Sequence, residues 1–235
     1  MMGDFTPIET VYAGCRFRSR LEARWAVFFD ALGEKWEYEK EGFDLPFGGP
    51  YLPDFWLPYQ QCWVEVKGVN PTKEEDTKAA ALAWATDHWV DVLIGPVGEH
   101  RIQGWRMPYG GRERLIALGL CARCDRLVFL RPHAIHMRDY IATRKGYEHA
   151  EWDEPIWSGR CYGCGSFTNE RGGTITTAPP VAQRLYDALQ AGRSARFEHG
   201  ESAASRAPIS KPAPSTSRGA ENYIRTKTVK PEGQN

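Results

Sequence analysis

The sequence lacks any long apolar run, because no stretch approaches the roughly 18 consecutive apolar residues that a membrane-spanning helix needs. Its first ten residues, MMGDFTPIET, also lack a basic segment followed by an apolar run, so we expect no secretory signal. No internal repeat is visible in the sequence. We therefore expect a soluble, cytoplasmic protein rather than a membrane-bound or exported one.

Cysteine is too sparse for a small disulfide-bonded scaffold, since the 235 residues include six cysteines and are 42% hydrophobic. A chain of this length, at roughly 150 residues per domain, forms one or two domains with a real hydrophobic core. Four cysteines form two Cys-x-x-Cys pairs, and the other two, Cys15 and Cys62, are isolated. We expect Cys62 to be a small buried hydrophobic residue.

Net charge is absent as well, since 30 basic and 30 acidic side chains give a formal charge of zero. This balance hides an asymmetry: residues 1–100 carry 9 Lys and Arg against 17 Asp and Glu, whereas 101–235 carry 21 against 13. The basic excess is densest over 101–145. Such a segment either holds a polyanion such as a nucleic acid or is a solvated arginine-rich surface, and charge alone does not decide between them.

The hydrophobic pattern of the first hundred residues predicts an α/β or α+β domain of about 105 residues. A helix is expected where apolar residues follow a 3.6-residue period and Gly33 acts as a stop signal. A second helix is expected to start at Thr72, because Thr72 and Glu75 have capping-box spacing. The predicted helices span 19–32 and 72–88, and the predicted strands span 35–39, 51–57, 61–67 and 90–94.

The remaining chain divides by composition. We expect a Cys-x-x-Cys module over 109–178, after a first domain over 1–108, and a short amphipathic helix over 179–192, centred on 181–189. Residues 193–235 are rich in Ser, Ala, Pro, Arg and Gly and have few large apolar groups. They cannot bury enough surface to offset the entropy of ordering, so we predict a disordered tail.

The most informative stretch is a predicted hairpin that carries two carboxylates. A turn at residues 58–61 sets a register in which Phe55 faces Val64 and Asp54 faces Glu65. Lys67 lies on the same face as this acidic pair, while the other face is apolar. Like charges directly opposed across a hairpin are unfavourable, so a cation is expected between them, and Mg²⁺ is commonly held by one or two carboxylates. The alternative without a functional role is an exposed hairpin face with a cross-strand ion cluster.

Glu22 in the first predicted helix has two readings. Ser19 and Glu22 have capping-box spacing, which explains the glutamate without any chemistry. Glu22 also lies beside the buried stripe of Trp25 and Phe29, so it can point at the sheet. The two readings are compatible.

Together these residues resemble the PD-(D/E)xK nuclease superfamily. Pro53 and Asp54, followed after ten residues by Glu65, Val66 and Lys67, match its motif, and the helix with Glu22 looks like its first motif. The resemblance covers about residues 11–96 and is closest to small nucleases encoded by phages. It implies a restriction-endonuclease-like fold, a mixed sheet flanked by helices, and a Mg²⁺- or Mn²⁺-dependent endonuclease that cleaves DNA in a bacterial or phage-infected cell.

Roles for individual residues follow from this resemblance. Asp54 and Glu65 would bind Mg²⁺ together with the backbone carbonyl of Val66, Lys67 would assist the attacking water, and Glu22 would be an accessory ligand. Relatives often carry a Gln on the next helix, where this sequence offers Lys73 or Lys78. The basic residues before the first helix would contact phosphates; they are Arg16, Arg18 and Arg20.

The two Cys-x-x-Cys pairs predict a second metal site. Four thiolates suit tetrahedral Zn²⁺, which would be structural because all four positions are filled by protein; the ligands would be Cys121, Cys124, Cys161 and Cys164. A redox pair or unmetallated thiols are the alternatives. The arginines of this zinc-ribbon-like module would hold DNA, with Arg123, Arg126 and Arg131 foremost.

We therefore predict a metal-dependent deoxyribonuclease. The main alternative is a non-catalytic, zinc-containing DNA-binding protein that keeps the nuclease fold, and a weaker one is a phage structural or regulatory factor. DNA is the expected partner. The sequence does not decide between a monomer and a homodimer, or among duplex, single-stranded and branched substrates.

Overall fold

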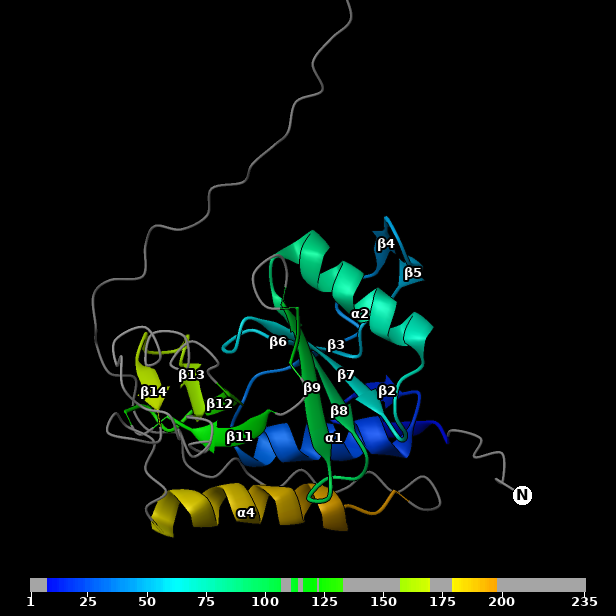
Figure 1. Ribbon diagram of the computed structural model, residues 1–235. Helices are drawn as coiled ribbons and strands as arrows, with labels where there is room; N and C mark the ends of the chain where they lie inside the picture. Colours follow the sequence, from blue (N-terminus) through cyan, green and yellow to red (C-terminus); the bar gives the residue numbers. More distant parts are fainter. Residues whose placement is uncertain are drawn as a thin grey trace, which may run out of the picture.

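The computed structural model describes residues 8–106, 111–113, 116–121, 123–132, 157–169 and 179–197. Over these residues the protein has a mixed α/β fold, as predicted. A mixed sheet of six strands, in the order β10-β9-β8-β7-β6-β3, has helix α2 on one face and helices α1 and α4 on the other (Figure 1). None of the described helices is long and apolar enough to span a lipid bilayer.

The elements of the central sheet are β3 (Glu37–Tyr38), β6 (Phe55–Leu57), β7 (Cys62–Lys67), β8 (Trp89–Ile94), β9 (Arg101–Arg106) and β10 (Gly111–Glu113). A second sheet contains β11 (Ala117–Leu120), β12 (Leu127–Pro132), β13 (Trp157–Arg160) and β14 (Phe167–Asn169). Two hairpins pair β1 (Thr10–Tyr12) with β2 (Cys15–Phe17) and β4 (Phe43–Leu45) with β5 (Gly49–Tyr51). The helices are α1 (Arg20–Ala31), α2 (Lys73–Thr86) and α4 (Pro179–Ser194).

Local signals determine where the first two helices begin. Ser19 is the N-cap of α1, and its hydroxyl accepts a hydrogen bond from the Glu22 N–H. The helix ends before Gly33, which adopts a left-handed φ of +67°. At α2, Thr72 and Glu75 form the complete capping box. Both predicted starts are confirmed, because capping depends on residues within one turn of each other.

The predicted hairpin register is confirmed. Phe55 pairs with Val64 and Leu57 with Cys62 in the antiparallel β6–β7 ladder. Strand β7 then pairs in parallel with β8, which makes the sheet mixed. As expected, the buried residues of one face of this hairpin pack against α1; they are Phe55, Leu57, Cys62, Val64 and Val66.

The opposite face of the hairpin is covered, so the alternative of an exposed hairpin face is wrong. Trp56 and Trp63 are buried there, with ring centroids 4.6 Å apart. They pack in a second core with Leu82 and other apolar residues of α2. The acidic pair of this hairpin therefore lies beside a covered core, which is a setting of low dielectric.

Other elements differ from the expectations. The strand predicted over 51–57 is broken at residues 52–54, so Tyr51 belongs to β5 and Phe55 to β6. Strands β9 and β10 extend the sheet beyond Ile94, and β10 lies past the domain boundary predicted at residue 108. Each of these strands pairs in antiparallel orientation with the strand that precedes it in the chain, although no strand is expected beyond residue 94 from the local pattern.

The second sheet shares the main core instead of standing apart. Leu120, Leu127 and Phe129 are buried in the same cluster as the residues of α1. Buried polar groups reinforce the junction: Glu34 accepts a hydrogen bond of 2.6 Å from the Leu127 N–H, and Gln60 donates one of 3.1 Å to the Leu127 carbonyl. The sheet that carries the cysteine pairs is thus fixed to the central domain through both the N–H and the carbonyl of Leu127.

Arg131 forms another junction between the two sheets. Its guanidinium bonds both oxygens of the fully buried Asp91, at 2.5 and 2.7 Å, and lies 3.7 Å from the centroid of Trp89. The Arg131 side chain is only 14% exposed. The expected place of Arg131 on an open DNA-holding surface is therefore wrong, because its charge is committed to an internal carboxylate.

Replacing Arg131 with methionine should lower the free energy of unfolding by about 3–5 kcal/mol, since it leaves Asp91 as an uncompensated buried carboxylate. Urea denaturation followed by circular dichroism measures this change. Arg160→Met is the matched control, because Arg160 is exposed on neighbouring β13 and should change stability by less than about 0.5 kcal/mol. Equal stabilities of the two variants would contradict the assigned role of the pair.

Helix α4 begins at Pro179, as predicted, and ends at Ser194, two residues beyond the predicted end at 192; it packs along α1 (Figure 1). Gly192 allows the close approach, since a Cβ there would lie 2.8 Å from the Arg24 carbonyl oxygen. Phe197 is buried against Tyr12, with ring centroids 6.0 Å apart. The predicted tail therefore starts too early at residue 193; the rest of it, 198–235, lies outside the described residues.

His100 gives the core an expected pH dependence. Its ring packs edge-on against Trp25, and burial lowers the pKa of His100 to about 4. The unfolded chain takes up the proton near pH 6.5, so the stabilisation is complete above that pH and is lost as the pH falls towards 4. In the wild type, His100 should lower the free energy of unfolding by up to about 2 kcal/mol as the pH falls. His100→Gln should lack this decrease, and measurement of the free energy of unfolding against pH compares the two proteins. Parallel profiles would contradict this expectation.

Candidate functional site

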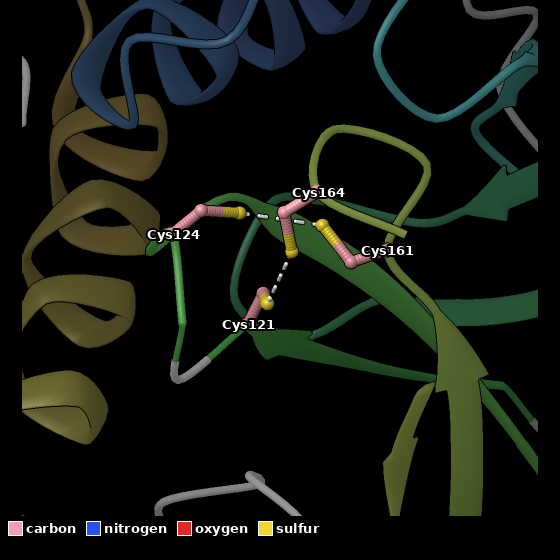
Figure 2. Close-up of side chains that lie close together, drawn as sticks. All are labelled: Cys121, Cys124, Cys161 and Cys164. Atoms are coloured by element: carbon pink, nitrogen blue, oxygen red, sulfur yellow. Dashed lines mark hydrogen bonds between the residues drawn. The ribbon is translucent and has the colours of Figure 1, made fainter. Parts of the chain in front are cut away.

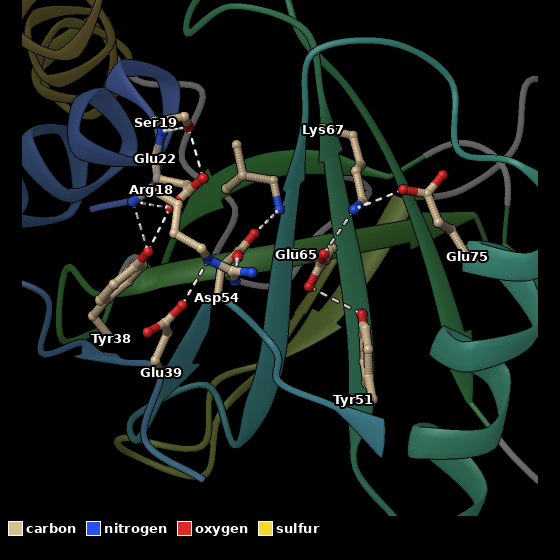
Figure 3. Close-up of polar contacts among 11 residues, drawn as sticks. Arg18, Ser19, Glu22, Tyr38, Glu39, Tyr51, Asp54, Glu65, Lys67 and Glu75 are labelled. Atoms are coloured by element: carbon tan, nitrogen blue, oxygen red, sulfur yellow. Dashed lines mark hydrogen bonds and ion pairs between the residues drawn. The ribbon is translucent and has the colours of Figure 1, made fainter. Parts of the chain in front are cut away.

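The acidic pair of the hairpin is assembled where β6 and β7 diverge (Figure 3). Asp54 precedes β6 and is 3% exposed, and Glu65 lies within β7 and is 6% exposed. One oxygen of Asp54, Oδ2, accepts a hydrogen bond of 2.7 Å from the Val66 N–H. This bond anchors the aspartate to the strand that carries Glu65. The predicted role of the Val66 carbonyl as a metal ligand stays a prediction.

Lys67 is the third residue of the predicted site, after Asp54 and Glu65. Its Nζ lies 2.9 Å from Glu65 Oε1 and 2.9 Å from Glu75 Oε1 (Figure 3). Partial burial opposes the charge of Lys67, but the two glutamates outweigh it and raise the pKa of Lys67 above its ordinary value. Lys67 is thus held as a protonated cation between the sheet and α2.

Glu22 is both a cap partner and a neighbour of the site. Its buried carboxylate accepts hydrogen bonds from the Ser19 hydroxyl at 2.7 Å, the Tyr38 hydroxyl at 2.6 Å and the Arg18 N–H at 3.2 Å. Its negative charge still reaches Asp54, whose pKa it raises. Ser19 therefore caps the helix and Glu22 points inward, but the Glu22 carboxylate bonds the Arg18 N–H instead of the Ser19 N–H that would complete a capping box.

The electrostatics of the site favour an added cation. Burial, followed by the charges of Glu65 and Glu22, raises the pKa of Asp54 well above its ordinary value. Five carboxylates share the contact network with the two cations Arg18 and Lys67, a formal charge of −3 when all are ionised; they are Glu22, Glu39, Asp54, Glu65 and Glu75. Hard oxygen donors with excess negative charge are the donor set that Mg²⁺ prefers.

The acidic residues of this site do not form a cage of three or more protein ligands for a metal ion. Among the described residues, only the four module cysteines bring three or more ligand side chains within 4.8 Å of one another. Asp54 and Glu65 stay the predicted ligands, since Mg²⁺ held by only one or two carboxylates completes its shell with water or substrate oxygens. Glu22, with three hydrogen bonds already, fits an accessory role.

The three arginines at and before the start of α1 have different surroundings. Arg16 is exposed and pairs with Glu9 at 3.3 Å. Arg18 pairs with Asp54 at 2.8 Å and with Glu39 at 2.7 Å. Arg20 is half-buried, and its Nε has no hydrogen-bond partner among the described residues. Of the three, Arg18 reaches the acidic pair directly.

On α2 the residue that reaches the site is Glu75. Lys78 instead pairs with Glu74 at 3.0 Å, and Lys73 is exposed. Replacement of the family's Gln by either lysine stays a prediction that these contacts do not favour. The double function of Glu75, as capping-box residue and as partner of Lys67, has no signature in the sequence.

Two tyrosines were missed by the sequence reasoning. Tyr51 donates a hydrogen bond of 3.0 Å to Glu65, and Tyr38 donates the bond to Glu22. Burial is the main cause that raises the pKa of each hydroxyl, so both remain proton donors at neutral pH. The only available signal was that Tyr38 falls in a predicted strand and Tyr51 at the start of another.

The four cysteines of the second predicted site come together (Figure 2). The sulfurs of Cys121 and Cys164 lie 3.6 Å apart, and those of Cys124 and Cys161 lie 3.4 Å apart. None of the six cysteines forms a disulfide bond. Four sulfurs within 4.8 Å of one another can hold a metal ion such as zinc.

The two cysteine turns have the same backbone design. In the first, the Cys121 N–H donates to the Arg126 carbonyl and the Asp125 N–H donates to the Cys121 carbonyl. The second repeats both bonds, with Cys161, Gly165 and Ser166 in the equivalent positions. Asp125 and Gly165, each following a second cysteine, adopt left-handed φ angles of +60° and +74°. Matching turns aim two pairs of sulfurs at one point.

The cysteines differ in acidity before any metal binds. Burial raises the pKa of Cys161 to about 11. Burial also opposes ionisation of Cys164, but hydrogen bonds with Ser166 outweigh it and lower the pKa of Cys164 to about 6. Since metals bind thiolates, a metal ion would have to displace protons from this cluster.

The other predicted DNA-holding residues lie near the first cysteine turn. Arg123 is exposed, whereas the Arg126 guanidinium stacks 3.5 Å from the centroid of Tyr59. Residues 133–156, which contain Arg138, Arg144 and Lys145, lie outside the described part of the chain.

Comparison of the chain with family models, curated proteins and solved structures finds no match.

Proposed function

We propose that the protein is a Mg²⁺-dependent nuclease of the PD-(D/E)xK type that hydrolyses DNA phosphodiester bonds. The observation that carries the proposal is the buried pair of Asp54 and Glu65 beside protonated Lys67 (Figure 3). Burying two carboxylates together is costly unless a cation offsets their charge. An arrangement that costs stability is typical of a functional site.

A bound Mg²⁺ ion would supply Lewis-acid stabilisation of the phosphate and a more acidic water. The chain itself supplies the orientation. Val66 fixes Asp54, Tyr51 fixes Glu65, and Glu75 holds Lys67 against Glu65. As a fixed cation, Lys67 is suited to stabilise the negative charge that develops on the phosphate and to orient the attacking water.

The finer fold assignment belongs to the same proposal. The mixed sheet, the helix that carries Glu22 and the hairpin that carries the acidic pair support a restriction-endonuclease-like domain. The cysteine cluster would hold structural Zn²⁺, since four protein sulfurs leave no open position for a substrate. DNA is favoured as substrate by the basic excess over 101–145, although Arg131 within it faces inward.

The test is incubation of the purified full chain with duplex, single-stranded and branched DNA in Mg²⁺, in Mn²⁺ and in EDTA. We expect cleavage in either metal, none in EDTA, and none by Glu65→Gln. Glu74→Gln is the matched control, because Glu74 is an exposed glutamate of α2 and should leave cleavage unchanged. Tight, salt-sensitive DNA binding without cleavage in any metal would instead support the non-catalytic DNA-binding protein.

A further inference from the structure

Arg18 covers the second oxygen of Asp54. Its Nη2 lies 2.8 Å from Asp54 Oδ1, while Asp54 Oδ2 is bonded to the Val66 N–H (Figure 3). The Arg18 side chain is 54% exposed, whereas that of Asp54 is 4% exposed. The buried carboxylate is thus in contact with a guanidinium that itself faces solvent.

Glu39 holds the same guanidinium from the other side. Its Oε1 lies 2.7 Å from Arg18 Nε, and its N–H donates a hydrogen bond of 2.9 Å to the Asp54 carbonyl. Glu39 has a left-handed φ of +45°, which a non-glycine residue adopts at some energetic cost. The strained residue therefore ties Arg18 and Asp54 together through two separate contacts.

A divalent ion and the guanidinium compete for Asp54 Oδ1. Because two cations only a few ångströms apart repel each other by several kcal/mol at protein-like dielectric, both cannot occupy this oxygen without mutual cost. The other oxygen is committed to the Val66 N–H. A metal that binds Asp54 therefore meets Arg18 first.

Resting on the nuclease function proposed above, we propose that Arg18 is a displaceable counter-ion of Asp54. In the metal-free protein it neutralises the carboxylate; when the metal takes its place, the guanidinium turns to the phosphate backbone of the DNA. Five N–H donors in a planar fork suit a phosphate group. Glu39 keeps the released arginine at the edge of the site. Arg18 is thus a positioning residue that couples metal entry to substrate binding.

The test measures metal affinity directly, without turnover. Calorimetric titration of the zinc-loaded full chain with Ca²⁺, at mildly alkaline pH, compares the wild type with Arg18→Gln. Removing a cation from the ion's neighbourhood should tighten Ca²⁺ binding by about tenfold or more. Arg16→Gln is the matched control, since Arg16 lies two residues before Arg18, is 75% exposed and pairs with Glu9. It should leave the affinity unchanged.

A second variant distinguishes the effect of the positive charge of Arg18 from the effect of its planar shape. Arg18→Lys keeps the positive charge, so its Ca²⁺ affinity should stay within about threefold of the wild type, while its DNA affinity in Ca²⁺ falls as in Arg18→Gln. Unchanged or weaker Ca²⁺ binding by Arg18→Gln, or equal tightening by Arg18→Lys, overturns the counter-ion role alone. Identical isotherms for the wild type and Asp54→Asn overturn the metal-dependent function itself.

Discussion

Asp54→Asn is expected to reduce DNA cleavage by about a thousandfold or more while leaving the metal-free protein as stable as the wild type or more stable. Asparagine can still accept the hydrogen bond of the Val66 N–H, so the local structure should persist. It lacks the charge that holds a divalent ion. Losing several kcal/mol of transition-state stabilisation corresponds to about three factors of ten in rate.

The stability half of this prediction follows from the surroundings of Asp54. Burial and the charges of Glu65 and Glu22 raise its pKa, so the folded protein binds the proton more tightly than the unfolded chain. The contribution of Asp54 to stability is therefore complete at low pH and is lost as the pH rises through the raised pKa. At neutral pH the asparagine escapes this loss, and we expect that gain to outweigh the lost pair with the half-exposed Arg18.

The measurement pairs two assays on the same preparations: cleavage rates in Mg²⁺ and thermal unfolding in EDTA. Asp44→Asn is the control, because Asp44 is exposed on β4 and should behave as the wild type in both. If Asp54→Asn cleaved DNA at the wild-type rate, Asp54 would not be a metal ligand. If it unfolded at a much lower temperature, the aspartate would be a structural residue.

Local features of the site could be predicted from the sequence. The caps at Ser19 and Thr72 depend on residues within one helical turn. The register that brings Asp54 near Glu65 depends on a four-residue turn and on strict alternation of side chains. These interactions are short in sequence separation, so the residue pattern contains nearly all the information that determines them.

Long-range packing could not be predicted. The burial of Trp56 and Trp63 depends on where α2 crosses the sheet, and the inward turn of Arg131 depends on Asp91, 40 residues earlier. A count of charged residues along the sequence assumes that every arginine side chain is exposed, although Arg131 neutralises a buried carboxylate. The contacts of Arg18 with Glu39 and Asp54 likewise join three segments whose approach only the fold defines.

The cysteine module should be inseparable from the stability of the whole protein. Arg184 of α4 binds both Asp125, which follows Cys124, and the Leu32 carbonyl at the end of α1. Glu34 binds the Leu127 N–H two residues further on. The first cysteine turn is therefore tied to α1, the helix that carries Glu22 at its other end.

Cys161→Ser is accordingly expected to abolish zinc binding at the proposed site and to destabilise the entire fold, not only the module. Structural zinc binds peptides of this type with an apparent free energy of about 10–16 kcal/mol, part of which maintains the fold. We expect zinc content to fall from about one ion per chain to near zero, and the melting temperature to drop by about 10 °C or more. Mass spectrometry of the metal and thermal unfolding measure the two effects.

Cys15→Ser is the control that distinguishes loss of the four-sulfur site from loss of a cysteine elsewhere in the chain. Cys15 lies on β2, half-buried and outside the four-sulfur cluster, so this variant should keep its zinc and its melting temperature. A Cys161→Ser protein that retained a full zinc ion would show that the cluster is not the binding site. One that lost zinc yet melted as the wild type would show that Glu34, Gln60 and Arg184 hold the module without metal, because those contacts reach the backbone directly.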